Sequence, residues 1–206
     1  MIKRYSTEKA REIVRKDTDL IDGICFSCGL PPSWLKAILM MELPEIDLFD
    51  LAADAVVGLN WLRYACTRRF SMDRHTRNPL RKFDSSTGYG QIFAQVAIEA
   101  ILFAREHGLR DLPGIPEEMF PLNPDNLRSV WFRLHRDKTF NLSCSALNLL
   151  SAAWEMTGRL DFGSFTEEEK KLIFSRYNSS AKKITEYGEQ AYRYYLEYEA
   201  QPGERL

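Results

Sequence analysis

The sequence predicts a mainly α-helical protein with little or no β structure, folded as a single domain over residues 1–206. Apolar residues recur at spacings of three and four along most of the chain, which is the pattern of amphipathic helices. Proline, glycine and capping residues separate these stretches, and the strict alternation of a strand is nearly absent. No repeat or low-complexity linker divides the chain. Its 45% hydrophobic and 28% charged residues are ordinary for a globular protein.

Residues 7–28 carry the first helical pattern, with Ile13, Leu20, Ile24 and Cys28 among its apolar positions. Gly29 and two prolines end it, so we predict one amphipathic helix here, within an N-terminal segment at 1–29.

A second helix begins near Pro32 and ends on an acidic residue. Leu35, Ile38 and Glu42 occupy positions i, i+3 and i+7, so the carboxyl shares the core-facing side. Pro44 ends the helix, which places Glu42 in its last turn, at the negative end of the helix dipole. Burial and dipole both favour the protonated form, which makes Glu42 a candidate general acid. The ordinary alternative is an exposed glutamate or one paired with an arginine.

The middle of the chain predicts a helix at 47–70, a basic surface loop at 71–83, a glycine turn at 84–91 and an apolar helix at 92–107. In the turn, glycines flank Tyr89 and allow the backbone to run close to a neighbouring helix or a ligand. The inward side of the helix at 47–70 is expected to carry Phe49, Ala53, Val56, Val57, Asn60 and Tyr64.

The second half predicts four more helices after a proline-rich connection at 109–121. The first begins at Asn123 and Pro124, and the next, at 141–157, is apolar nearly all round and therefore belongs at the centre of the fold. A capping box at Thr166–Glu169 opens a helix that runs to Asn178. A last helix is expected from near Ser180, with an inner side formed by Ile184, Tyr187, Ala191, Tyr194, Tyr195 and Tyr198.

Charge and cysteine content give no sign of nucleic acid, membrane or metal. The formal net charge is −1, and no run of about 18 apolar residues is present, so we expect neither nucleic-acid binding nor membrane insertion. Cys25 and Cys28 have the spacing of a zinc or redox pair but lack a second pair, so we expect buried free thiols, no metal and no cofactor. One stretch is locally basic through Arg63, Arg68, Arg69, Arg74, Arg77, Arg81 and Lys82.

An ordered series of motifs resembles the lysozyme-like superfamily, in its branch of goose-type lysozymes and soluble lytic transglycosylases. The resemblance covers roughly residues 30–198. Its motifs are the helix ending in Glu42, the stretch Ser86-Thr87-Gly88-Tyr89-Gly90-Gln91-Ile92, Asn123-Pro124-Asp125-Asn126-Leu127, Arg176-Tyr177-Asn178 and Tyr187-Gly188.

The resemblance implies a catalytic core at 30–198 that cleaves the β-1,4 bond between N-acetylmuramic acid and N-acetylglucosamine in peptidoglycan, with Glu42 as the acid. It also implies a substrate-binding set formed by Ser86, Tyr89, Gln91, Tyr177 and Asn178. The chain departs from the family pattern in a longer segment between Glu42 and Gln91, in Gly90 where the family has methionine, and in Ser179-Ser180 where it has glycine.

Hydrolysis and transglycosylation are both left open by the sequence. An inverting hydrolase needs a second carboxylate to activate water. We favour Asp84 for this role, ahead of Asp47, Asp50 and Asp73, although turn formation is the ordinary role of an aspartate at such a position. Without a second carboxylate, Glu42 could act next as a base and let the 6-hydroxyl of the sugar close an anhydro ring.

Two other classes of function are compatible with the sequence: an inactive lysozyme-like module that binds glycan or protein, and a helical regulatory protein. The expected partner is the peptidoglycan glycan strand, while an inhibitor or immunity protein has no residue-level support. No signal peptide is visible, so we expect synthesis in the cytoplasm and delivery to the cell wall by a non-classical route.

Overall fold

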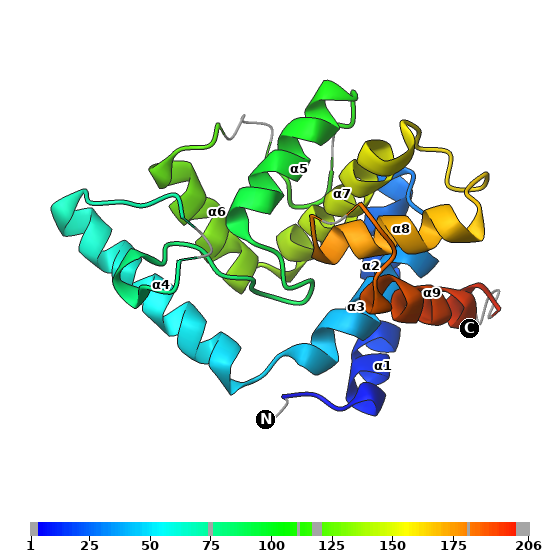
Figure 1. Ribbon diagram of the computed structural model, residues 1–206, viewed down its shortest axis with the longest axis horizontal. Coiled ribbons are helices and arrows are strands. Elements are labelled where there is room, and N and C mark those ends of the chain that lie inside the picture. Colours follow the sequence, from blue (N-terminus) through cyan, green and yellow to red (C-terminus); the bar gives the residue numbers. More distant parts are fainter. Residues whose placement is uncertain (1–3, 74–75, 111, 117–120, 181, 201–206) are drawn as a thin grey trace.

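A computed structural model of the chain describes residues 4–73, 76–110, 112–116, 121–180 and 182–200. This part of the chain forms nine α-helices and two short 3₁₀ helices, and its β structure is one isolated bridge between Thr87 and Ile92. The predicted mainly α class is therefore confirmed (Figure 1). None of the described helices is both long and apolar enough to span a bilayer. Arg74 of the basic stretch and residues 111 and 117–120 of the proline-rich connection lie outside the described residues.

The N-terminal segment contains two helices where the sequence predicted one: α1 (Thr7–Lys16) and α2 (Thr18–Cys28). Asp17 interrupts them, with a ψ of 12°, and its carboxylate accepts hydrogen bonds of 2.8 and 2.9 Å from Lys138 Nζ. This ion pair joins residues 121 positions apart and favours the break between α1 and α2 at Asp17. Helical periodicity in the sequence does not reveal such a long-range contact. Gly29 ends α2 in the left-handed region at φ 73°, as predicted.

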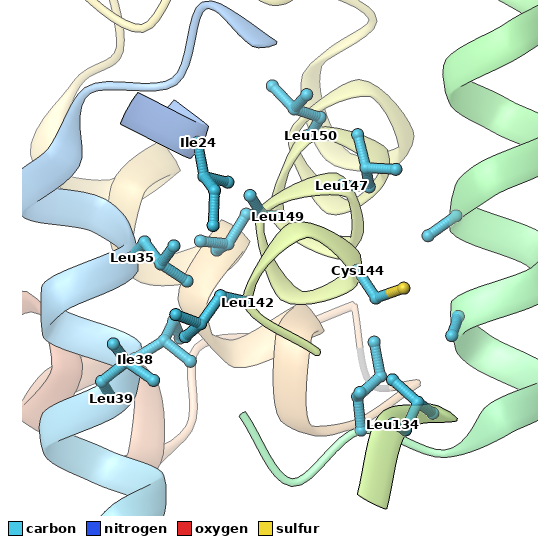
Figure 2. Close-up of a cluster of buried hydrophobic side chains, with 14 of the residues drawn as sticks. Ile24, Leu35, Ile38, Leu39, Leu134, Leu142, Cys144, Leu147, Leu149 and Leu150 are labelled. Carbon is cyan, nitrogen blue, oxygen red and sulfur yellow. The ribbon is translucent and has the colours of Figure 1, made fainter. Parts of the chain in front are cut away.

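Helix α7 (Lys138–Thr157) lies at the centre of the fold, as its all-round apolar sequence predicted. It packs against α2, α3, α5, α6 and α8, and every residue from Phe140 to Leu150 is buried. Figure 2 shows Leu142 and Leu149 on the side of α7 that faces Ile24 and α3 (Pro32–Glu42), whose Leu35 and Ile38 lie opposite them. Burial of these aliphatic groups contributes about 1.5–3 kcal/mol per side chain.

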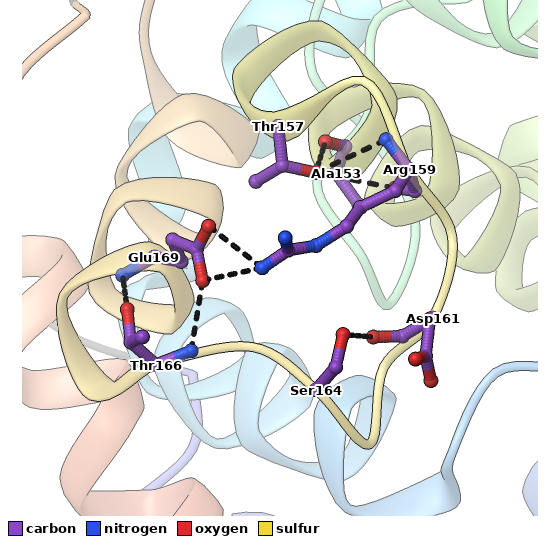
Figure 3. Close-up of polar contacts among 7 residues, drawn as sticks. All are labelled: Ala153, Thr157, Arg159, Asp161, Ser164, Thr166 and Glu169. Atoms are coloured by element: carbon purple, nitrogen blue, oxygen red, sulfur yellow. Dashed lines mark hydrogen bonds and ion pairs between the residues drawn. The ribbon is translucent and has the colours of Figure 1, made fainter.

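Helices α8 (Glu167–Asn178) and α9 (Glu186–Glu199) close the fold beside α3. The predicted capping box is present, and Arg159 donates two bonds of 2.8 Å to the carboxylate of its Glu169 (Figure 3). The predicted start of the last helix near Ser180 is wrong. Thr185 caps α9, and its backbone N–H donates to Ser175 Oγ at 2.9 Å, so Ile184 precedes the helix and is 38% exposed instead of packing inward.

The remaining helices are α4 (Leu48–Thr67), α5 (Ala94–Glu106) and α6 (Pro124–Arg136). The 3₁₀ helix η1 (Leu43–Glu45) joins α3 to α4, and η2 (Pro79–Arg81) lies in the basic loop. Figure 1 shows α4 along one edge of the molecule. Val57, Asn60 and Tyr64 of α4 are buried as predicted, whereas Phe49, expected to face inward, is 74% exposed.

Candidate active site

Glu42 ends α3 and is enclosed by the C-terminal helix. Only 9% of its surface is exposed, and the hydroxyl of Tyr187 on α9 donates a 2.5 Å hydrogen bond to its Oε1. The short turn that follows, with Leu43 and Pro44 buried, fixes the direction in which the helix end points. The amphipathic pattern of α3 thus carries the carboxyl into the protein, as the sequence predicted.

The pKa of Glu42 is raised from 4.5 to about 7, chiefly because burial penalises the charged carboxylate. The hydrogen bond from Tyr187 opposes this shift by stabilising the anion, while the negative charges of Glu45 and Asp50 add to it. A carboxyl with this pKa is partly protonated at neutral pH and can donate a proton there.

The glycine turn is held by one buried amide. Asn141 of α7 accepts from the N–H of Gly90 at 2.9 Å and donates to the carbonyl of Thr87 at 2.9 Å. Gly88 has a φ of 74°, and Gln91 adopts a left-handed φ of 44°, which is costly for a residue with a Cβ. The sequence analysis assigned Asn141 no role; the available signal was an asparagine at the start of a helix that is apolar nearly all round, and the structure buries it fully.

Gly90 is required by its neighbours. A Cβ at this position would lie 1.9 Å from Ser145 Oγ and 3.0 Å from the hydroxyl of Tyr177, which itself donates to the carbonyl of Gly90 at 2.8 Å. The turn therefore lies directly on α7 and α8, and a residue with a Cβ would not fit at this position without a shift of its neighbours.

A cleft of about 320 Å³ opens beside this turn. The first residues of α4, the glycine turn and the junction of α6 and α7 form its walls, together with the N-terminal segment. Glu42 is not among the lining residues, but the adjacent Leu43 is. The cleft is lined by Arg4, Tyr5, Leu43, Ile46, Asp50, Leu51, Asp54, Thr87, Gly88, Tyr89, Gln91, Leu134, His135, Arg136 and Lys138.

Asp54 is the carboxylate that sequence analysis missed. It lines the cleft with its side chain 11% exposed, and it accepts hydrogen bonds from Ser85 Oγ at 2.7 Å and Thr87 Oγ1 at 3.0 Å. Burial raises its pKa, opposed first by these two hydrogen bonds and then by the nearby His135. The available signal was its place as one of three charged residues in the 20-residue helix α4.

His135 of α6 completes this cluster. Its Nδ1 lies 3.1 Å from Thr87 Oγ1 and 3.4 Å from Asp54 Oδ2. Trp131 stacks on the imidazole with ring centroids 5.7 Å apart and donates from its indole N–H to Ser85 Oγ at 2.9 Å. The carboxylate, two hydroxyls and an imidazole thus meet at one wall of the cleft.

The structure brings together only part of the predicted site. Tyr89 and Gln91 line the cleft, and the hydroxyl of Tyr177 lies behind the turn. Ser86 is half-buried and does not line the cleft. Asn178 is exposed at the end of α8 and does not line the cleft either.

The four predicted second carboxylates occupy different surroundings. Asp84 is 2% exposed, and its two oxygens accept from the backbone N–H groups of Ala94 and Gln95, which caps α5 and explains why this helix begins two residues later than predicted. Asp47 is the buried N-cap of α4, and Asp73 is exposed outside the cleft lining. Of the four, Asp50 lies on the cleft.

Within the described residues, no group of three or more His, Cys, Asp or Glu side chains is arranged to hold a metal ion. Cys25 and Cys28 are buried free thiols, and burial raises the pKa of both, that of Cys28 to about 11. No family model, curated protein or solved structure matches this chain.

Proposed function

We propose that this protein hydrolyses the β-1,4 bond between N-acetylmuramic acid and N-acetylglucosamine in peptidoglycan, as a lysozyme-like muramidase. The observation that carries the proposal is Glu42, a buried carboxyl with a pKa of about 7 whose neighbour in the chain, Leu43, lines a cleft that holds the carboxylates of Asp50 and Asp54. Glycosidases commonly divide their chemistry between two such groups. The resemblance of the surrounding motifs to the lysozyme-like superfamily supports the same reaction.

In this proposal, protonated Glu42 donates its proton to the oxygen of the departing sugar. Asp54 accepts a proton from a water molecule, whose oxygen then bonds to the anomeric carbon from the opposite face. Thr87 lies within hydrogen-bond distance of Asp54 and lines the cleft, so it is suited to orient that water. The presence of a second carboxylate favours hydrolysis over transglycosylation.

The charges of the cleft suit an anionic glycan. Arg4, Arg136 and Lys138 line it beside the acidic pair Asp50 and Asp54. Peptidoglycan carries carboxylates on its muramic acid and stem peptides, whereas chitin is uncharged. Cationic side chains attract such carboxylates and orient the strand that bears them.

The direct test is Glu42→Gln, which preserves the size of the side chain and removes the acidic proton. We expect this variant to remain folded by circular dichroism and to release no glycan fragments from purified peptidoglycan. Glu186→Gln is the matched control because it changes an exposed glutamate next to Tyr187, and it should retain full activity. Undiminished turnover by Glu42→Gln would exclude Glu42 as the acid.

One observation favours the alternative of a catalytically inactive binding module: Glu42 is not on the cleft wall. Such a module would retain muropeptides without cleaving them. Wild-type protein that binds muropeptides in calorimetry but releases no fragments would favour this alternative over the hydrolase.

A further inference from the structure

Two aromatic side chains, one turn apart on α6, reach the carboxylate of Asp54 through hydroxyl groups. Trp131 and His135 stack with their ring planes 10° apart and their centroids 5.7 Å apart. Trp131 is 3% exposed, whereas the side chain of His135 is 42% exposed and lines the cleft. Of the two rings, the imidazole is the one that can gain and lose a proton.

The path from Trp131 ends on one oxygen of the carboxylate. The indole N–H donates to Ser85 Oγ at 2.9 Å, and the Ser85 hydroxyl donates to Asp54 Oδ1 at 2.7 Å. An indole nitrogen can only donate, so the direction of both hydrogen bonds is fixed. Ser85 is 3% exposed, which limits competition from water for these bonds.

The path from His135 ends on the other oxygen. The Thr87 hydroxyl donates to Asp54 Oδ2 at 3.0 Å, and His135 Nδ1 lies 3.1 Å from Thr87 Oγ1. A hydroxyl has one hydrogen, and that of Thr87 is directed at Asp54. Nδ1 of His135 must therefore carry a hydrogen and donate it to Thr87. Thr87 is itself held in place, since its carbonyl accepts from Asn141 Nδ2 at 2.9 Å.

Both paths stabilise the anionic form of Asp54. Each carboxylate oxygen accepts one hydrogen bond from a hydroxyl and keeps a second lone pair for a proton that arrives from the cleft. Donors to a carboxylate favour its charged form, whereas burial favours the neutral form. In agreement, burial raises the pKa of Asp54, and the two hydroxyl donors and then His135 lower it. Without these donors, Asp54 would stay protonated up to a higher pH and could not act as a base there.

Other ionisable groups also line the cleft around this pair. They are Asp50 on α4, Arg136 on α6, Lys138 on α7, Arg4 and Tyr5 of the N-terminal segment, and Tyr89 of the glycine turn. The negative charge of Asp50 adds to the raised pKa of Asp54. His135 opposes it with a ring nitrogen 3.4 Å from Asp54 Oδ2, so a protonated imidazole stabilises the carboxylate by its charge as well as through Thr87.

We propose that His135 is a positioning residue that acts through Thr87 to hold Asp54 as an anion able to accept a proton from water. Trp131 is its counterpart on the second oxygen, through Ser85, and does not titrate. This role rests on the proposed function, in which Asp54 is the base. It adds regulation by pH to that function, because His135 then sets how far the pH can fall before Asp54 is protonated and hydrolysis stops.

The first experiment titrates Asp54 itself and does not depend on activity. NMR follows the carboxyl carbon of Asp54, assigned with Asp54→Asn, across the acidic and neutral range. His135→Leu removes the N–H donor and should move the titration of Asp54 to higher pH. His135→Asn has the shape of leucine but offers an amide N–H near the position of Nδ1, so it should restore most of the wild-type titration.

His107→Leu is the matched control, because His107 lies at the end of α5 and does not line the cleft. It should leave the titration of Asp54 unchanged, and circular dichroism checks that each variant is folded. An Asp54 titration that is the same in His135→Leu and wild type would overturn the proposal. An asparagine variant that titrates like the leucine variant would equally overturn the path through Thr87.

The second experiment measures hydrolysis of purified peptidoglycan as a function of pH. On the acidic side of the profile, His135→Leu should have a kcat about tenfold below wild type with little change in KM, while the decline at high pH that follows Glu42 should stay in place. The two proposals fail separately. If wild type releases no fragments while the Asp54 titration still moves in His135→Leu, the hydrolase is excluded and the link between His135 and Asp54 is supported. If both proteins are active with identical pH profiles, the role of His135 is excluded.

Discussion

The burial of Glu42 has two opposing effects. It keeps the carboxyl protonated near neutral pH, and it lowers the folding stability of the protein once the proton has left. The pKa of Glu42 is about 7 in the folded protein and near the ordinary 4.5 in the unfolded chain. A raised folded-state pKa means that stability is fully present below pH 4.5 and is lost as the pH rises to about 7. The difference between the two values corresponds to about 3 kcal/mol.

We therefore expect wild type to lose about 3 kcal/mol of unfolding free energy between pH 4 and pH 8 that Glu42→Gln does not lose, because glutamine has no proton to release. Urea unfolding at the two pH values measures this. Glu186→Gln, at an exposed position, should track wild type. Parallel pH profiles for Glu42→Gln and wild type would show that the carboxyl is solvated.

Asp54 and Asp84 offer a second residue-level prediction, because Asp54 lines the cleft whereas Asp84 is buried as the cap of α5. Under the proposed mechanism, Asp54→Asn should abolish hydrolysis because it removes the proposed base, while Asp84→Asn should retain it, since Asp84 caps α5 and lies outside the cleft lining. Mass spectrometry of peptidoglycan digests would measure reducing-end and anhydro products. Anhydro ends from the wild type would assign the reaction as transglycosylation instead.

The packing of the glycine turn against α7 requires a residue without a Cβ at position 90. A methyl group at Gly90 would overlap Ser145 Oγ of α7, so Gly90→Ala should lower the unfolding free energy by about 1–3 kcal/mol. Gly163→Ala is the matched control, since its Cβ would lie 3.6 Å from the nearest atom, Asp161 Oδ1. Thermal or urea unfolding compares the two, and equal stability of both variants would contradict the close approach of the turn to α7.

At the scale of elements, periodicity and caps predicted α3 and α8 well, because their boundaries are set by local residues such as Pro32 and Thr166. The end of α7 was predicted correctly, but its start at 141 was wrong, because Asp137 caps the helix and it begins at Lys138. Other errors have non-local causes. Lys138 pairs with Asp17 across the break between α1 and α2, and the Asp84 side chain determines where α5 begins from ten positions away. Contacts of this kind leave no periodic trace in the sequence.

The candidate site was predictable only in part for the same reason. The inward direction of Glu42 could be predicted because one helix carries it, and the close approach of the backbone around Tyr89 because turn chemistry is local. Gln91 was predicted from the motif resemblance, and it lines the cleft. The surroundings of Asp54 are assembled from α4, the glycine turn and α6, so its hydroxyl and imidazole neighbours could not be deduced from spacing. Tyr187 was expected on the inner side of its helix, but its bond to Glu42 joins residues 145 positions apart.

At the scale of the whole molecule, the cleft gathers charges from separate elements: its acidic residues come from α4, and its basic residues come from the N-terminal segment and the α6–α7 junction. We expect Arg136→Gln to raise the KM for peptide-bearing glycan strands severalfold and to leave uncharged N-acetylglucosamine oligomers unaffected. Initial rates at low and high salt would measure this, since screening should reduce the difference. Arg193→Gln, exposed on α9, is the control.

The ion pair between Asp17 and Lys138 also bears on where the minimal unit of this protein begins. Arg4 and Tyr5 belong to the cleft wall, and the two helices that follow them are tethered to α7 through that pair. A fragment trimmed to residues 30–198 would keep Glu42 and the glycine turn yet lack one side of the groove. Anyone shortening the gene for expression should therefore keep the codons for Arg4 and Tyr5.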